Sequence, residues 1–162
     1  MTPTCRALDR HVLDVVRQGR FTHVIIAARW ENWRTRGFEA LPATIAALRR
    51  AGASVTVIGQ TPTFSADVQT IAYRSGATDT GTASWPIAVD RRINQDLRRA
   101  SIGATFVDPI ALLCGADACP YKAGRSFLFA DDGHFSATAS RRAVPLLFPF
   151  IRDRADRDFG GS

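Results

Sequence analysis

Three short runs of consecutive apolar residues limit the fold of this chain more than any other feature of its sequence. A strand whose side chains are apolar on both sides is typical of a parallel sheet covered on both faces, whereas a half-exposed strand alternates. We therefore expect buried parallel strands in THVIIAA (22–28), SVTVIG (54–59) and ATFVD (104–108).

The segments around these runs have apolar residues at helical spacing. Gly52 is placed to end a helix over 38–51, and Ser136 is placed to cap the start of the helix that begins there. Pro145 lies inside the last segment, so a kink or an early end is expected there. The expected helices are 6–18, 38–51, 64–74, 87–100 and 136–152. This alternation predicts an α/β fold, a three-layer α/β/α domain with a parallel sheet, similar to flavodoxin.

The length of 162 residues predicts one domain, over 1–152, followed by a polar tail over 153–162. The net charge of +6 raises the question of a polyanionic partner. Lys122 is the only lysine, and the arginines are scattered in pairs without a zinc-finger or RRM signature. We therefore expect a solvated arginine-rich surface and no nucleic-acid partner; strongly salt-dependent DNA binding is the alternative.

The sequence has no apolar run of about 18 residues, so no transmembrane segment is expected within it. The first residues, MTPTCRALDRHVLD, lack the apolar core of a signal peptide. No cofactor is expected.

Two of the three cysteines, Cys114 and Cys119, form the segment CGADAC. A metal site would need further cysteine or histidine ligands nearby, and none is present, so no metal is expected. A small disulfide-closed loop is the preferred interpretation and would indicate an oxidising compartment; two free thiols are the alternative. Cys5 has no assigned partner.

The segment FADDGHFSA (129–137) places Asp131 three residues before His134. Asp131 can accept a hydrogen bond from Nδ1 of His134, which leaves Nε2 able to take a proton from a nucleophile. Gly133 would let the backbone turn between the two residues. Asp132 is expected to be solvated. The spacing alone is a weak signal, since many such pairs are surface residues.

The positions that follow the predicted strands are the places where α/β proteins collect functional residues. Arg29 and Trp30 follow the first strand. Arg29 could hold an oxyanion or an anionic glycan group, and Trp30 could stack on a sugar. The structural alternative is an ion pair for Arg29 and core packing for Trp30.

Four blocks, VIIAARW, VIGQTPTF, FVDPIALLCGADAC and LFADDGHFS, occur in this order along the chain. Together they resemble the SGNH-hydrolase-like domain at the carboxyl end of many bacterial acyltransferase 3 family membrane proteins, over about Cys5 to Leu147. The last block is the most specific, because it is similar to the D-x-x-H-L-S segment of that family. Phe135 replaces the usual Leu, and Ala139 stands where glycine is common.

The resemblance implies that Asp131 and His134 are the acid and base of a Ser-His-Asp triad. It implies acyl transfer or ester hydrolysis, often acetylation of a cell-surface polysaccharide, with an acylated glycan or acyl donor as partner. It also implies a periplasmic or membrane-associated location and an acyltransferase membrane domain that would precede this one.

The serine of the family lies in a G-D-S segment on a strand upstream of THVIIAA, and this sequence contains no G-D-S. Ser136 is expected to cap a helix instead. We therefore expect a truncated SGNH domain that lacks its first strand and its nucleophile. The edge of strand 22–28 would then be exposed and could cause self-association. The alternative is a non-catalytic remnant or glycan-binding module.

Overall fold

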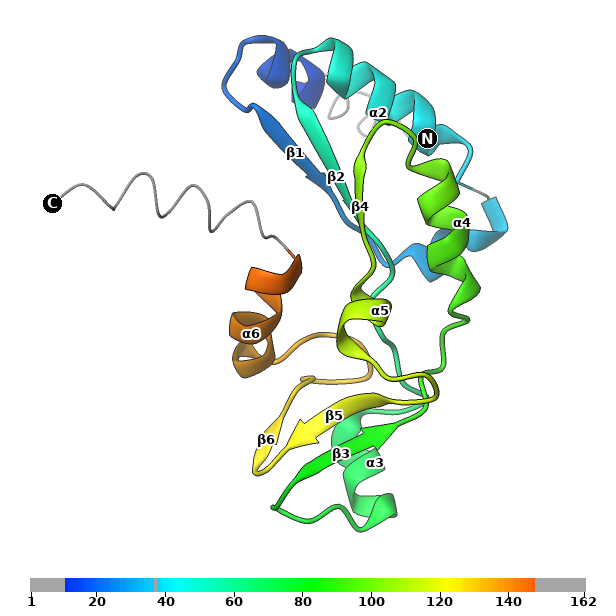
Figure 1. Ribbon diagram of the computed structural model, residues 1–162, viewed down its shortest axis with the longest axis vertical. Helices are drawn as coiled ribbons and strands as arrows, with labels where there is room; N and C mark the ends of the chain where they lie inside the picture. The colour runs from blue at the N-terminus through cyan, green and yellow to red at the C-terminus, as the bar shows by residue number, and fades with distance from the viewer. Residues whose placement is uncertain (1–10, 37, 148–162) are drawn as a thin grey trace, which may run out of the picture. The chain divides into compact units, whose positions relative to one another are not determined.

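The computed structural model describes residues 11–36 and 38–147 (Figure 1). The chain divides into two compact units. The first unit comprises Met1–Gln60 with Arg92–Val107, and the second comprises Thr61–Arg91 with Asp108–Ser162. The predicted tail over 153–162 lies outside the described residues.

The first unit is built on a parallel sheet, as the three apolar runs predict. Its strands are β1 (His23–Ile26), β2 (Ser54–Ile58) and β4 (Thr105–Val107), in the order β1-β2-β4 (Figure 1). The central strand, β2, has four consecutive buried residues after Ser54. No residue of the edge strand β1 is fully buried, although all but His23 are apolar.

Helices cover this sheet and end where the sequence predicts. Residues 11–17 are helical, which confirms that part of the predicted helix 6–18; residues 6–10 lie outside the described residues, and Gln18 is in a turn. A 3-10 helix, η1 (Trp30–Arg36), follows β1. Helix α2 (Ala40–Arg50) packs on β2 with its apolar face of Leu41, Ile45 and Leu48. Ala51 is the C-cap of α2, and Gly52, with a positive φ of 99°, follows it. Helix α4 (Arg92–Ala100) packs on η1.

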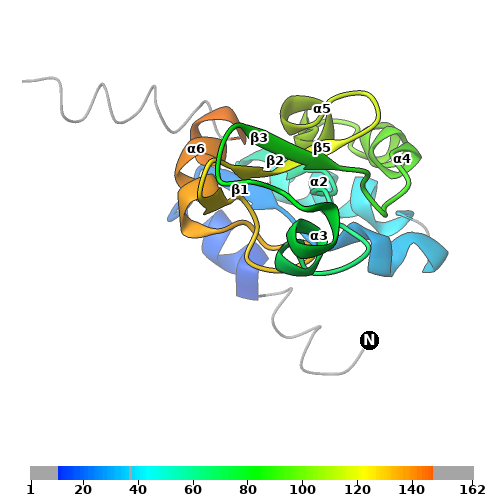
Figure 2. The same cartoon turned by 90° about the horizontal axis from the view of Figure 1, so that it is seen from below.

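The second unit contains an antiparallel sheet that the sequence did not predict. Its strands are β3 (Thr82–Trp85), β5 (Cys119–Ala123) and β6 (Ser126–Phe127), in the order β3-β5-β6. Helix α3 (Val68–Ser75) lies beside β3 and β5 in Figures 1 and 2. The core of the unit joins buried residues of α3, β5 and the adjoining loops: Phe64, Val68, Ile71, Ala72, Cys119, Tyr121 and Phe129.

Two further helices, α5 and α6, belong to the second unit. Helix α5 (Pro109–Leu113) is capped by Asp108, whose Oδ1 accepts a hydrogen bond from the Ala111 backbone at 3.1 Å. Helix α6 (Ala137–Leu147) is capped by Ser136, as predicted, and contains Pro145. No helix within the described residues is both long enough and apolar enough to cross a membrane.

Candidate active site

The segment that carries Asp131 and His134 is a tight loop between β6 and α6. Phe129 and Phe135 pair as an isolated antiparallel bridge, and the Ala130 backbone N–H donates to the His134 carbonyl at 2.7 Å. The centroids of the two phenylalanine rings lie 5.0 Å apart, and Phe129 is 2% exposed. The aromatic pair therefore anchors both ends of the loop in the core of the second unit.

Within this loop the Asp131 carboxylate and the His134 imidazole form a direct hydrogen bond. Nδ1 of His134 lies 2.7 Å from Oδ2 of Asp131. The other carboxylate oxygen, Oδ1, accepts from the backbone N–H of Gly133 at 2.9 Å and of His134 at 2.7 Å. Because an ionised carboxylate only accepts, Nδ1 carries the proton and neutral His134 keeps a basic Nε2. No described residue is hydrogen-bonded to Nε2.

These donors hold Asp131 in its ionised form. The pKa of Asp131 is lowered from 3.8 to about 2, first by the Gly133 backbone N–H, then by the His134 backbone N–H, and then by the His134 side chain. The side chain of His134 is 76% exposed and that of Asp131 is 38% exposed. The imidazole is thus oriented by its own loop and remains largely exposed to solvent.

Gly133 is needed for a reason other than the predicted turn. Its φ is not positive, so a residue with a side chain could adopt the same backbone conformation. A Cβ at this position would lie 3.0 Å from Cγ2 of Thr63. Glycine here permits close approach of the loop to residues 62–63. The neighbouring Asp132 contributes to the same contact, since its carbonyl accepts from the Phe64 backbone at 2.7 Å.

Ser136 occupies a structural position rather than a nucleophilic one. Its hydroxyl donates to the Phe127 carbonyl at 2.8 Å and accepts from the Ala139 backbone at 3.2 Å. Both hydrogen-bonding functions of the hydroxyl are therefore used within the fold. Among the described residues, the only side chain hydrogen-bonded to His134 is that of Asp131.

His23, on strand β1, has a different setting. His23 on β1 lies 2.7 Å from the Ser54 hydroxyl and 3.0 Å from the Thr56 hydroxyl, both on β2. His23 and Ser54 are partners in the parallel register. The imidazole therefore links the two strands, which is a structural role.

Trp30 and Arg29 belong to the first unit. Trp30 is 7% exposed, its indole N–H donates to the Ile58 carbonyl at 2.7 Å, and its ring packs edge-on against Phe38. This burial matches the structural alternative and leaves the indole covered rather than available to a sugar. Arg29 forms an ion pair with Glu31 at 2.5 Å, and its side chain is 44% exposed.

The paired cysteines are joined as a disulfide between Cys114 and Cys119, with a Cα–Cα distance of 4.2 Å. The bridge connects the end of α5 to the start of β5. The described residues contain no group of three or more Cys, His, Asp or Glu side chains arranged to bind a metal ion.

A parallel sheet flanked by helices is consistent with an SGNH-type fold, and the chain also has an Asp-x-x-His loop before helix α6. Residues 2–149 match the family model described as the SGNH domain fused to AT3 domains. The chain therefore belongs to this family, whose domains are of the acyl-transfer or hydrolase type. No curated protein and no solved structure matches the chain.

Proposed function

We propose that this chain contributes the acid and base residues of a site for acyl transfer or ester hydrolysis. The observation that supports this best is the fixed orientation of His134, with Nδ1 hydrogen-bonded to Asp131 and Nε2 hydrogen-bonded to no described residue. Such an imidazole can act as a general base, and a carboxylate that stays ionised stabilises the imidazolium formed during the reaction.

The reaction proceeds in two steps. Nε2 of His134 takes the proton of a serine hydroxyl while the serine oxygen attacks the acyl carbonyl, and the imidazolium then returns that proton to the leaving alcohol. In the second step Nε2 takes a proton from water or a sugar hydroxyl while that oxygen attacks the acyl-serine, and the imidazolium gives the proton to the serine oxygen as the ester bond breaks. The acyl group is that of a cell-surface polysaccharide, and the site lies outside the cytoplasm, where the Cys114–Cys119 disulfide is stable.

The nucleophile is not assigned to any residue of this sequence. The 162 residues contain no G-D-S segment, and the hydroxyl of Ser136, next to the loop, is used within the fold. We propose that the serine is carried by polypeptide outside these residues. Arg29 and Trp30 are left out of the proposed site because Glu31 pairs with one and the core covers the other.

The decisive experiment compares the chain alone with the chain joined to a G-D-S-bearing segment. The DNA upstream of the Met1 codon is the first place to look for that segment. The chain alone should hydrolyse a simple acetyl ester no faster than its His134→Ala variant. The joined protein should be active, and His134→Ala should lower kcat by about 10²- to 10⁴-fold. Turnover by the chain alone that His134→Ala abolishes would contradict the assignment of the serine.

Asp131 is proposed as a positioning residue, so its test needs a readout besides rate. In Asp131→Asn the amide can donate toward Nδ1, which favours the tautomer with the proton on Nε2. Imidazole ¹⁵N shifts of His134 at pH 8 should therefore change from the Nδ1–H to the Nε2–H form, while those of His23 stay unchanged. Identical shifts in both proteins would exclude the positioning role.

The absence of a G-D-S segment also favours a second candidate, a glycan-binding module without catalysis. Binding of an acetylated polysaccharide that is equal in the chain and in His134→Ala, with no turnover in the joined protein, would support this candidate.

A further inference from the structure

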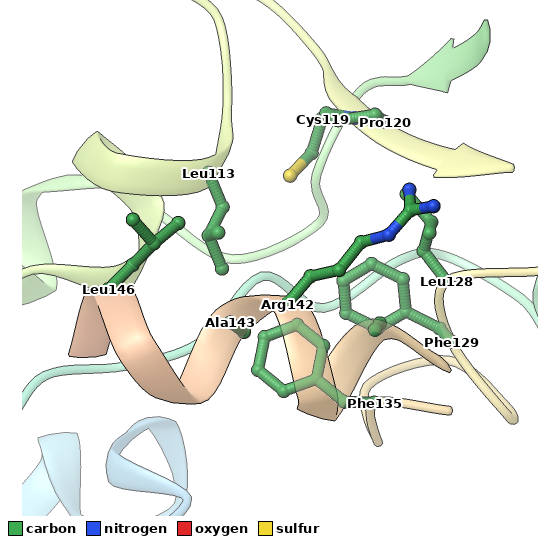
Figure 3. A pocket seen from close by; sticks show the side chains of 10 residues that line it. Leu113, Cys119, Pro120, Leu128, Phe129, Phe135, Arg142, Ala143 and Leu146 are labelled. Carbon is green, nitrogen blue, oxygen red and sulfur yellow. The ribbon is translucent and has the colours of Figure 1, made fainter. Parts of the chain in front are cut away.

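The second unit contains an apolar pocket that the proposed reaction does not use. It lies between α6, the end of α5, the start of β5 and the two phenylalanines that anchor the loop of Asp131 and His134 (Figure 3). Its volume is about 170 Å³. An engineered apolar cavity of about 150 Å³ binds benzene, so this pocket has room for a group of about six carbons.

The pocket exists because α6 turns its smallest side chains toward the rest of the unit. Ala139 and Ala143 lie one turn apart on the buried face of α6, and both line the pocket. Larger side chains at these positions would fill the space. Leu113 and Leu146 close one end, and in Figure 3 their side chains point toward one another.

One charged residue, Arg142, lines the pocket. Its side chain extends from α6 toward the part of the wall formed by Pro120 and Leu128 (Figure 3). Arg142 is exposed, and no described carboxylate forms an ion pair with it. All other lining residues are apolar, the disulfide-bonded Cys119 included. A guanidinium at the edge of an apolar pocket is suited to a ligand with an apolar body and one anionic end.

We propose that this pocket binds a small monocarboxylate whose apolar body has about five or six carbons. The apolar body occupies the space left by the alanines, and the carboxylate accepts hydrogen bonds from the Arg142 guanidinium. A single cation matches a single negative charge. The site is independent of the Asp131–His134 pair, so its failure and the failure of the proposed reaction are separate results.

The test uses the full 162-residue chain and ligand-observed NMR at low salt, with hexanoate as the probe. We expect a dissociation constant on the order of 1 mM. Hexanamide keeps the apolar body but has no charge, and acetate keeps the charge but lacks the body. Both should bind at least about threefold more weakly than hexanoate.

Variants locate the site. Arg142→Gln should weaken hexanoate binding by about three- to tenfold and leave hexanamide binding unchanged. The matched control is Arg141→Gln, which removes an equal charge from an exposed neighbour outside the pocket and should change little. Leu146→Glu, at a side chain that is 53% exposed, should also weaken hexanoate binding through like-charge repulsion.

Three results would overturn the proposal. They are an absence of hexanoate binding, equal affinities for hexanoate and hexanamide, and equal effects of Arg142→Gln and Arg141→Gln. His134→Ala should bind hexanoate as the unaltered chain does, because the imidazole does not line the pocket.

Discussion

At the scale of single residues, the orientation of His134 depends on its own loop. The carboxylate of Asp131 accepts hydrogen bonds from two backbone N–H groups and one imidazole N–H, all of them from residues two or three positions away. Short-range spacing is therefore enough to predict this pair. The hydrogen bonds that orient Asp131 and His134 all lie within this one loop.

The pKa of Asp131 gives a pH-dependent prediction. It is about 2 in the folded loop against an ordinary 3.8, so the loop gains stability from this carboxylate above pH 3.8 and loses it as the pH falls toward 2. Carboxyl ¹³C shifts should show Asp131 titrating near 2 in the folded chain and near its ordinary value in a peptide of residues 129–135.

His134→Ala separates the causes of this shift. It removes the imidazole but keeps the backbone N–H groups of residues 133 and 134, which include the largest cause. The pKa of Asp131 in this variant should therefore stay below 3.8. A return to the ordinary value would show that the imidazole, rather than the backbone, holds the carboxylate in its ionised form.

At the scale of elements, the segment after β2 is held to α4 by the side-chain amide of Asn94, which hydrogen-bonds with a backbone N–H and a backbone carbonyl. The Asn94 amide accepts from the Gln60 backbone N–H at 2.7 Å and donates to the Gln60 carbonyl at 3.1 Å, and both residues are almost fully buried. Gly59 makes this possible, since a Cβ there would lie 2.7 Å from Oδ1 of Asn94.

Asn94→Ala should destabilise the chain by about 2–4 kcal/mol, because it removes both hydrogen bonds that the Asn94 side chain makes to the buried backbone of Gln60. Urea unfolding measures the change. Gln95→Ala, on the exposed side of the same helix, is the control and should stay within about 0.5 kcal/mol of the original. Equal midpoints for both variants would mean that water replaces the amide at no cost.

The sequence predicts elements whose signal is local and misses those that depend on distant partners. The apolar runs identify the three parallel strands, and Ser136 identifies the start of α6. The antiparallel strands CPYKA and TASW were missed because proline and polar residues interrupt their apolar pattern. The pocket beside Arg142 could not be predicted either, since its walls come from separate segments between Leu113 and Leu146.

At the scale of the whole molecule, β1 does not have the surroundings that its sequence predicts. The run THVIIAA is apolar on both sides, yet no residue of β1 is fully buried, and Ile25 is 41% exposed. Among the strands that the structure describes, β1 is at the edge of its sheet. Beside it, residues of helix 11–17 and β1 line a hollow of about 360 Å³, with Phe21 58% exposed. An unpaired apolar edge is a template for pairing with another strand.

We predict that two copies of this chain associate through β1. Sedimentation velocity should show a mass that rises with protein concentration. Ile25→Lys places a charge on the edge strand and should shift the chain toward monomer, because an inserted lysine opposes edge-to-edge pairing. Ile102→Lys is the matched control: it makes the same substitution at a side chain that is 76% exposed outside β1, and it should leave association unchanged. A monomer at every concentration, or equal effects of the two lysines, would show that β1 is not the contact.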